Sequence, residues 1–389
     1  MKNAIVEAVE RLSVPYFELS DYIFDHPELG YQEHVSCAAL VKKLEETGYT
    51  VETGIAGMET AFRAVWENGE GGPSIGLLVE YDALAGLGHA CGHHMQGPCL
   101  MLCAEAVKEV LKDQPYRIVI YGTPAEECSP AKLIMWNEGC FRDIDVALMV
   151  HASINTATDL NALAQVSINV TYHGKNAHAA MFPERGRSAF DALQLAFHGV
   201  ELLREHVTDD VRMHYAVTNP GGPANVVPKE SSAEFVLRSR YSMNNLIDIK
   251  ERFYNILRGA ALMTDTTFET TESLMLPNKI PAVVLNDNIM KNAKEVGAPD
   301  LSPPRERPGS TDFSAVLYNI PGCCLRIKMV NNCTSHTPEF AAAGRTQACY
   351  DAITKAAQTL ACTCYDLICD PDLLNSVKED YAERRKKFA

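Results

Sequence analysis

The 389-residue sequence has no long apolar run and no excess of basic residues. No apolar run reaches the roughly 18 residues that a membrane-spanning helix needs, so we expect no membrane association. Lysine and arginine number 35 against 50 aspartates and glutamates, which gives a formal net charge of -15. Nucleic acid and anionic lipid surfaces are therefore not expected as main partners. A small anionic substrate remains compatible with this charge, because a pocket can carry the opposite sign locally.

The sequence also lacks a secretory signal and a disulfide framework. Residues 1–11 carry acidic side chains and no apolar core of a signal peptide. Several of the 13 cysteines fall in helix-like runs, where a buried and reduced thiol is typical: Cys37, Cys99, Cys103, Cys362 and Cys364. We therefore expect a cytoplasmic protein. Its 47% hydrophobic and 22% charged residues are ordinary for a globular protein, and its length suffices for more than one domain.

Three apolar runs predict buried strands that each deliver polar side chains near their carboxyl ends. These runs are 74–80, 116–121 and 145–150, and a helix is expected over 96–110 after the first of them. Open α/β folds place their sites in the loops that follow the carboxyl ends of strands. The sequence therefore predicts an α/β fold with its functional site at this edge.

A different pattern occupies the middle of the chain. Strand-like and helix-like signals between about 163 and 274 follow the order β-α-β-β-α-β, which is typical of a ferredoxin-like α+β sandwich. Signals of the first kind resume after about 280. We therefore predict a catalytic metal-binding domain formed by residues 1–164 and 278–389, with an inserted domain over 165–277. At the amino terminus, helical spacing predicts a single surface helix over 4–24.

The densest cluster of metal-type ligands lies in the stretch 88–94, which contains three histidines and one cysteine. Cys91 and His93 are two residues apart in a glycine-containing loop and could face one cation. Such ligands suit zinc or a neighbouring divalent transition metal. Glu127, His151 and His336 could complete one or two sites, and a thiolate could bridge two cations. His151 and His336 could instead be structural histidines at a strand end and in a loop.

The adjacent pair Glu126 and Glu127 follows the strand at 116–121. Neighbouring side chains point in different directions, so one carboxylate can bind metal while the other faces a reacting water molecule. A general base beside an activated water is what hydrolysis of an amide requires. An ordinary acidic surface turn is the alternative. Asp82, close after the strand at 74–80, could fix the tautomer of a ligand imidazole or could simply cap a turn.

Further polar residues could bind substrate. His178 lies among small residues after a strand, where a ligand can approach the backbone closely. Amide, guanidinium and backbone donors for a carboxylate could come from Asn225, Arg238, Gly309, Ser310 and Thr311. Each of these residues could equally have a structural role.

Together these motifs resemble a known family. The chain is similar to the metallopeptidase and amidohydrolase family of aminoacylase and carboxypeptidase G, within the branch of aminobenzoyl-glutamate hydrolase and the auxin-conjugate amidohydrolases. The matching stretches are 80–84 (EYDAL), 88–93 (GHACGH), 122–127 (GTPAEE), 225–228 (NVVP), 309–312 (GSTD) and the loop at His336. They span nearly the whole chain in the expected order.

The resemblance implies a fold and a set of roles. The fold would be a mixed-sheet, two-metal aminopeptidase-like catalytic domain with an inserted ferredoxin-like lid, through which the chain forms a homodimer. The implied ligands of two divalent ions are Cys91, His93, Glu127, His151 and His336, with Cys91 as the bridging candidate. Glu126 matches the general base, and His178 matches a lid histidine that can polarise the scissile carbonyl in the partner's site. Asn225, with Arg238 or Arg240, matches lid residues near the carboxylate of the substrate.

Two positions depart from the branch. His94 stands where asparagine or aspartate is usual, and Ala85 stands where proline is usual. His94 could add a ligand, change the metal preference or alter the floor of the pocket. The resemblance therefore transfers the reaction class and not the substrate.

We accordingly expect a metal-dependent amidohydrolase that cleaves the amide bond of N-acyl amino acids or dipeptide-like small molecules. The cofactor would be two divalent ions, with zinc favoured and manganese, cobalt or nickel able to use the same ligands. One alternative is a cysteine hydrolase with Cys91 as nucleophile, which chelator treatment would leave active. The other is a non-catalytic metal-binding scaffold of the same fold.

Overall fold

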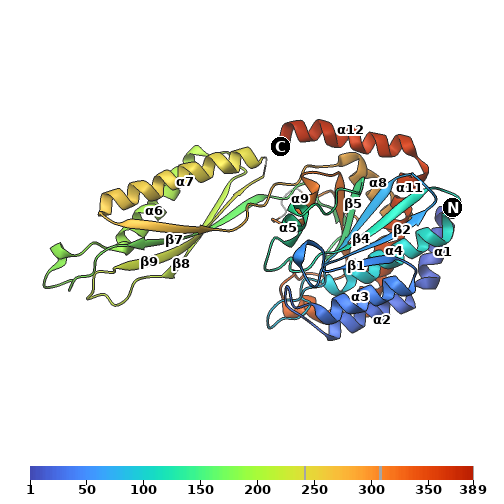
Figure 1. The fold of residues 1–389 in the computed structure, drawn as a ribbon, viewed down its shortest axis with the longest axis horizontal. Coiled ribbons are helices and arrows are strands. Elements are labelled where there is room, and N and C mark those ends of the chain that lie inside the picture. Colours follow the sequence, from blue (N-terminus) through green and yellow to red (C-terminus); the bar gives the residue numbers. More distant parts are fainter. Residues whose placement is uncertain (241, 306–308, 389) are drawn as a thin grey trace. The chain divides into compact units, whose positions relative to one another are not determined.

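The computed structural model describes residues 1–240, 242–305 and 309–388, and the chain divides into two compact units (Figure 1). The α/β unit consists of Met1–Asn161 and Lys279–Lys387. The inserted unit consists of Ala162–Asn278 together with the end of the chain. We expected divisions after residues 164 and 277, and the units divide after residues 161 and 278.

The α/β unit is built on a seven-stranded mixed sheet with the order β1-β2-β4-β3-β5-β11-β6. The strands are β1 (Thr50–Thr53), β2 (Phe62–Asn68), β3 (Ser74–Val79), β4 (Tyr116–Gly122), β5 (Val146–Ser153), β6 (Ala157–Thr158) and β11 (Gly322–Lys328). Strands β4, β3, β5 and β11 run parallel to one another, whereas β1, β2 and β6 pair in antiparallel fashion. Every residue of β3 is buried, as its continuous apolar run predicts for a central strand. The prediction of a mixed-sheet α/β fold is confirmed.

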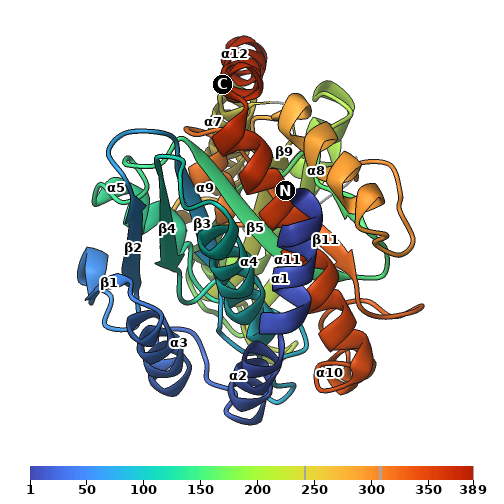
Figure 2. The same ribbon diagram turned by 90° about the vertical axis from the view of Figure 1, so that its right-hand side faces the viewer.

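Helices cover the sheet of the α/β unit. They are α1 (Lys2–Leu12), α2 (Val14–Asp25), α3 (His34–Glu46), α4 (Gln96–Val110), α5 (Ala131–Asn137), α8 (Val283–Glu295), α9 (Phe313–Leu317), α10 (Pro338–Ala342), α11 (Gln347–Cys369) and α12 (Pro371–Phe388). Figure 2 shows α4, α1 and α11 in front of the sheet, and α4 contacts β3, β4 and β5. Residues of α5 and α9 share a buried cluster with Leu78, Val119 and Met149 of the strands. Among the described residues, no helix combines the length and the apolar character needed to cross a bilayer.

Two expectations about element ends were wrong. The single helix predicted over 4–24 is two helices, which meet at Ser13. Pro15 explains the break, because proline has no backbone N–H and its ring clashes with the carbonyl four residues earlier. Strand β5 does not end on His151 but continues to Ser153, since its pairing with β11 extends to Lys328.

The inserted unit contains a four-stranded antiparallel sheet and two long helices. Its elements are β7 (Ala164–His173), α6 (Ala189–Leu203), β8 (Arg212–Asn219), β9 (Glu230–Ser239), α7 (Met243–Thr264) and β10 (Thr267–Glu272). The strand order β10-β7-β9-β8 is that of a ferredoxin-like sandwich, which confirms the prediction. Helices α6 and α7 lie on one face of this sheet (Figure 1), because alternate residues such as Ile168 and Phe235 are apolar and join the helices in one buried core.

Candidate metal centre

The candidate site forms where three neighbouring parallel strands end. Strand β3 lies between β4 and β5, so the segments that follow the three strands emerge at the same edge of the sheet. Glu80 and Asp82 follow β3, Glu126 and Glu127 come shortly after β4, and His151 lies near the end of β5. Parallel pairing thus gathers acidic and imidazole groups that are far apart in the sequence.

The loop before α4 brings a thiol and an imidazole to this edge. Gly92 has a positive φ of 85°, and a Cβ at this residue would lie 2.9 Å from the Cβ of Ala152. This close approach seats the loop directly on β5. The Sγ of Cys91 then lies 3.3 Å from the Nε2 of His151, and the rings of His93 and His151 are 5.5 Å apart and nearly perpendicular.

The loop after β11 closes the cluster from the other side. The backbone N–H of His336 donates to the carbonyl oxygen of Ala90, at 2.9 Å. The Nε2 of His336 lies 3.3 Å from Oε1 of Glu127. Unlike the buried His93, the side chain of His336 is 52% exposed, so this side of the cluster is open to solvent.

The clustered side chains form three overlapping groups whose potential ligand atoms lie within 4.8 Å of one another. The groups are Cys91, His93 and His151; Cys91, Glu127 and His336; and His93, Glu126 and Glu127. Cys91 belongs to two of them. Among the described residues, the buried Nε2 of His93 and Oε1 of Glu127 find no hydrogen-bond partner. Sulfur, nitrogen and oxygen donors with unsatisfied buried atoms fit a divalent transition metal.

Asp82 holds two parts of this cluster together. Its Oδ1 lies 2.8 Å from Nδ1 of His93, and its Oδ2 accepts a hydrogen bond of 2.9 Å from the backbone N–H of Glu127. A carboxylate on Nδ1 places the proton there and leaves Nε2 as the ring nitrogen with a free lone pair. Asp82 thus orients both an imidazole and a carboxylate.

The charges of the cluster favour cation binding. Burial raises the pKa of Cys91 to about 12. Burial, together with the charges of Arg326 and His93, lowers the pKa of His151 to about 3, so its imidazole is neutral and able to ligate. For His93, burial opposes protonation, but negative charge on Cys91, Glu80 and Asp82 outweighs it and raises the pKa.

Glu126 occupies a position suited to proton transfer. Burial and then the charges of Glu80 and Asp312 raise its pKa to about 8. A carboxylate with a pKa near neutrality can both accept and return a proton efficiently. The preceding Ala125 has a positive φ of 61°, and its N–H donates to Oε1 of the buried Glu33 at 2.8 Å. That hydrogen bond fixes the turn from which Glu126 projects.

His94 turns away from the cluster. It is buried, its Nε2 donates to the carbonyl oxygen of Gly344 at 2.9 Å, and its ring packs edge-on against Phe24 at 5.0 Å. None of the ligand groups found among the described residues includes it. His94 therefore has a packing role here.

The predicted substrate-binding residues fall into both units. In the α/β unit, Gly309, Ser310 and Thr311 precede α9, and the carbonyl oxygen of Thr311 accepts a hydrogen bond of 2.6 Å from the Ser314 hydroxyl. In the inserted unit, His178 and Asn225 lie in adjacent segments, because the N–H of Ala179 donates to the carbonyl oxygen of Asn225 at 3.0 Å. The half-buried Arg238 lies in β9, paired with Gln165 and Arg212 on either side. The substrate-binding roles of these residues stay predictions.

The sequence analysis assigned no role to Glu33, Glu80 or Lys132. Lys132 is fully buried in the first turn of α5 and contacts Glu80 and Asp312. A signal existed, since a charged residue within or beside a buried apolar run needs a partner. Its partners lie 52 and 180 residues away in the sequence, which spacing alone does not reveal.

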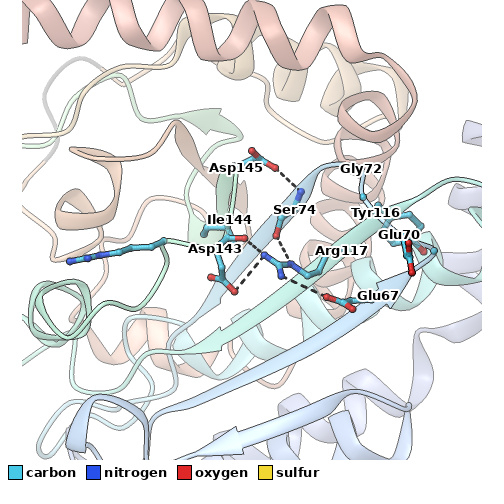
Figure 3. Close-up of a pocket in the computed structure, with 12 residues that line it drawn as sticks. Glu67, Glu70, Gly72, Ser74, Tyr116, Arg117, Asp143, Ile144 and Asp145 are labelled. Atoms are coloured by element: carbon cyan, nitrogen blue, oxygen red, sulfur yellow. Dashed lines mark hydrogen bonds and ion pairs between the residues drawn. The ribbon is translucent and has the colours of Figure 1, made fainter.

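A cavity of about 490 Å³ lies elsewhere in the α/β unit (Figure 3). Its lining includes Ser74 and Tyr116, the first residues of β3 and β4, so it lies at the opposite end of the strands from the metal-type cluster. Arg117 donates to the Ser74 hydroxyl at 3.0 Å and to the carbonyl oxygen of Asp143. The ion pairs drawn in Figure 3 thus involve much of the charge of this cavity.

Comparisons of sequence place the chain among known hydrolases. The model of peptidase family M20/M25/M40 matches residues 76–365. Human Xaa-Arg dipeptidase is 32% identical over an alignment covering 97% of this chain and 90% of that protein. A p-aminobenzoyl-glutamate hydrolase polypeptide of Escherichia coli is 30% identical, with 97% and 94% covered.

Comparisons of structure agree on the fold. An aminobenzoyl-glutamate utilization protein from Klebsiella pneumoniae matches with a TM-score of 0.71 and 18% identity, covering 95% of this chain and 97% of that one. A dinuclear metal-binding peptidase of Bacillus subtilis matches with a TM-score of 0.73 and 17% identity, covering 92% and 99%. The resemblance found in the sequence is confirmed. The chain belongs to peptidase family M20/M25/M40 and is a hydrolase of amide bonds.

Proposed function

We propose that this protein is a metal-dependent amidohydrolase that cleaves the amide bond of N-acyl amino acids or dipeptide-like molecules. The observation that carries the proposal is the convergence of Cys91, His93, Glu127, His151 and His336 at one edge of the sheet, with Glu126 beside them. These side chains come from segments between residues 91 and 336, so the cluster depends on the fold and not on one local motif.

Two divalent cations are the proposed cofactor, with Cys91 shared between their ligand sets. Zinc suits the thiolate, imidazole and carboxylate donors best, and manganese, cobalt or nickel could use the same ones. Bound cations would lower the pKa of a water molecule and polarise a carbonyl group. Two of the three ligand groups contain Cys91, which supports the bridging role.

Within this proposal, the residues of the chain have separate tasks. Glu126 takes a proton from the attacking water and returns it to the leaving amine. Asp82 keeps the Nδ1 proton on His93 and fixes the backbone of Glu127. His178 is proposed to polarise the carbonyl oxygen, and Asn225 and Arg238 are proposed to bind the carboxylate of the substrate.

The names of the relatives narrow the substrate class. One is a dipeptidase for Xaa-Arg, one hydrolyses p-aminobenzoyl-glutamate, and one from Enterobacter agglomerans hydrolyses indole-3-acetyl-aspartic acid. In each name an acyl group is joined to an amino acid. We therefore propose that the amine product of this enzyme is an amino acid.

The two alternatives make different predictions. A cysteine nucleophile reacts as a thiolate, and burial raises the pKa of Cys91 to about 12, which disfavours that role. Hydrolysis that survives EDTA would nevertheless support it. A non-catalytic scaffold would show no hydrolysis of any substrate when zinc, manganese, cobalt or nickel is supplied.

The decisive experiment is a hydrolysis screen with the metal-reconstituted protein. The substrates are N-acyl amino acids and dipeptides, including p-aminobenzoyl-glutamate and dipeptides that end in arginine, and products are read by mass spectrometry. With a substrate in hand, Glu126→Gln should retain its metal and lose at least ~100-fold in kcat, the usual scale for a positioned acid/base. The exposed Glu138→Gln is the matched control and should keep the wild-type rate. Near-normal turnover by Glu126→Gln would remove Glu126 from its role.

A further inference from the structure

A buried lysine sits next to the candidate metal centre. Lys132 has no exposed side-chain surface, and its ammonium donates to Oε1 of Glu80 and to Oδ1 of Asp312, each at 2.7 Å. Its backbone N–H donates to Oδ2 of Asp312 at 2.9 Å. Both carboxylate oxygens of Asp312 are therefore occupied by one residue.

Glu126 supplies a third carboxylate at the same place. One oxygen each of Glu80, Glu126 and Asp312 lies within 4.8 Å of the others, a spacing at which three carboxylates could hold a metal ion. Hard divalent cations such as Mg²⁺ and Mn²⁺ prefer such oxygen ligands. In this protein the positive charge among them is already present, as the ammonium of Lys132.

Glu80 links this group to the candidate metal ligands. Its Oε2 lies 3.2 Å from Nε2 of His93 and accepts a hydrogen bond of 2.7 Å from the amide of Gln96. The backbone N–H of Glu80 donates to the same amide of Gln96 at 3.2 Å. Glu80 is thus held by Lys132 on one oxygen and by Gln96 on the other.

We propose that Lys132 acts as a built-in cation, which keeps Glu80, Asp312 and Glu126 together and prevents a further divalent ion from binding among them. Lys132 is then a positioning residue for Glu126, and this part of the inference rests on the proposed function. A divalent ion in this place would take an oxygen of Glu126 as a ligand, and that oxygen could no longer accept a proton. A single ammonium neutralises part of the negative charge without competing for Glu126 in that way.

The test replaces Lys132 by a residue of similar length without charge. Lys132→Met leaves three carboxylates with no internal cation. After incubation with excess Mn²⁺ or Zn²⁺ and removal of free metal, Lys132→Met should retain one more ion per chain than the wild type, measured by inductively coupled plasma mass spectrometry. Its kcat should fall at least 10-fold while KM stays within 2-fold, because Glu126 is affected and substrate binding is not.

Two further variants make the result specific. Lys132→Met combined with Asp312→Asn removes one carboxylate from the group and should lose the extra ion. Lys108→Met removes a lysine that is 8% exposed and paired with Glu105 elsewhere in the α/β unit, and should keep the wild-type metal content and kcat. If Lys132→Met folds only when Mn²⁺ or Zn²⁺ is present, the ion has replaced the ammonium and the inference is supported.

The inference is overturned if Lys132→Met binds no additional ion, or if it fails to fold with and without these metals. Metal content is measured independently of turnover, so this outcome does not depend on the substrate. A wild-type protein that hydrolyses nothing in the screen would instead count against the proposed function. An active Lys132→Met with wild-type kcat and metal content would leave the function standing and remove the role of Lys132.

Discussion

Among single residues, Asp82 connects the largest number of proposed roles. One of its oxygens faces Nδ1 of His93 and the other accepts the N–H of Glu127. Asp82→Asn keeps the shape but substitutes an NH₂ group for one acceptor, so one of the two donors loses its partner. We expect metal affinity to fall roughly 10–100-fold, the scale found for residues that orient metal ligands. Competition with a chromogenic chelator measures this affinity.

The exposed Asp113 provides the control for this substitution. Asp113→Asn makes the same chemical change in the same unit, and should leave the affinity for metal unchanged. Equal affinities for Asp82→Asn and the wild type would show that Asp82 does not orient the ligands.

Asp143, which lines the cavity in Figure 3, predicts a pH-dependent contribution to stability. Burial opposes its ionisation, but hydrogen bonds from Tyr121 and Arg63 outweigh burial and lower its pKa. A lowered pKa in the folded state stabilises the protein above the unfolded-state pKa of about 3.9, and this stabilisation is lost as the pH falls through the folded-state value. At pH 7, Asp143→Asn should therefore cost about 1.5–3 kcal/mol, the scale of hydrogen bonds to a charged group.

Urea denaturation at a series of pH values between 7 and 3 checks this expectation. The difference between wild type and Asp143→Asn should be constant near neutrality and should shrink below pH 4. A difference that persists unchanged at the acid end would assign the effect to packing and not to the charge of Asp143.

The residues that the sequence identified are those with a local signal. Cys91 and His93 share one loop, and Glu126 and Glu127 are adjacent, so residue type and spacing were informative. Glu80, Lys132 and Asp312 form their contacts across 52 and 180 residues, and nothing in their local sequence states which charges meet. The partners of buried charges therefore became visible only in the folded chain.

At the level of elements, the loop before α4 depends on one glycine. Gly92 and Gly86 both have positive φ values, 85° and 74°, in the same segment. A Cβ on Gly92 would lie 2.9 Å from Ala152, whereas one on Gly86 would meet no described atom within 4 Å. Gly86→Ala should thus cost only the backbone penalty of about 1–2 kcal/mol. Gly92→Ala should cost roughly 1–3 kcal/mol more, because crowding is added.

Chemical denaturation of both variants measures the two costs, and metal content adds a second readout. Gly92→Ala should lose metal because the shift of the loop displaces Cys91 from His151, while Gly86→Ala should retain it. Identical stability and metal content in the two variants would contradict the close contact between this loop and β5.

The elements themselves were largely predictable because apolar periodicity is a local property. The buried strand at 74–80 and the helix at 96–110 appear as β3 and α4. The ends of elements were less predictable, since tertiary pairing decides them. Strand β5 runs past His151 because β11, which follows 169 residues after β5 ends, supplies hydrogen-bond partners as far as Ser153.

At the scale of the whole molecule, the two units have separate cores. Alternate residues of β7 and β9 pack with α6 and α7 within the inserted unit alone. We expect residues 162–278 expressed by themselves to fold, since a domain of this size can bury a sufficient core. Cooperative thermal unfolding followed by circular dichroism is the measurement. Gradual loss of signal without a transition would show that this unit needs the rest of the chain.

The predicted homodimer through the inserted unit belongs to the same scale. Sedimentation of the full chain and of residues 162–278 should give twice the monomer mass in both cases, if the inserted unit carries the interface. Only monomer for the full chain would count against the dimer. A dimer of the full chain with a monomeric inserted unit would move the interface to the α/β unit.

The interruption of the α/β unit by the insertion has a consequence for biosynthesis. The ribosome completes Cys91, His93, Glu127 and His151 early, but β11 and His336 emerge only after all of residues 162–278 have been made. The nascent chain consequently carries exposed thiol, imidazole and carboxylate groups for most of translation without the last member of the set. Loading with cations therefore belongs to the final stage of maturation, when the carboxyl-terminal segment joins the edge of the sheet.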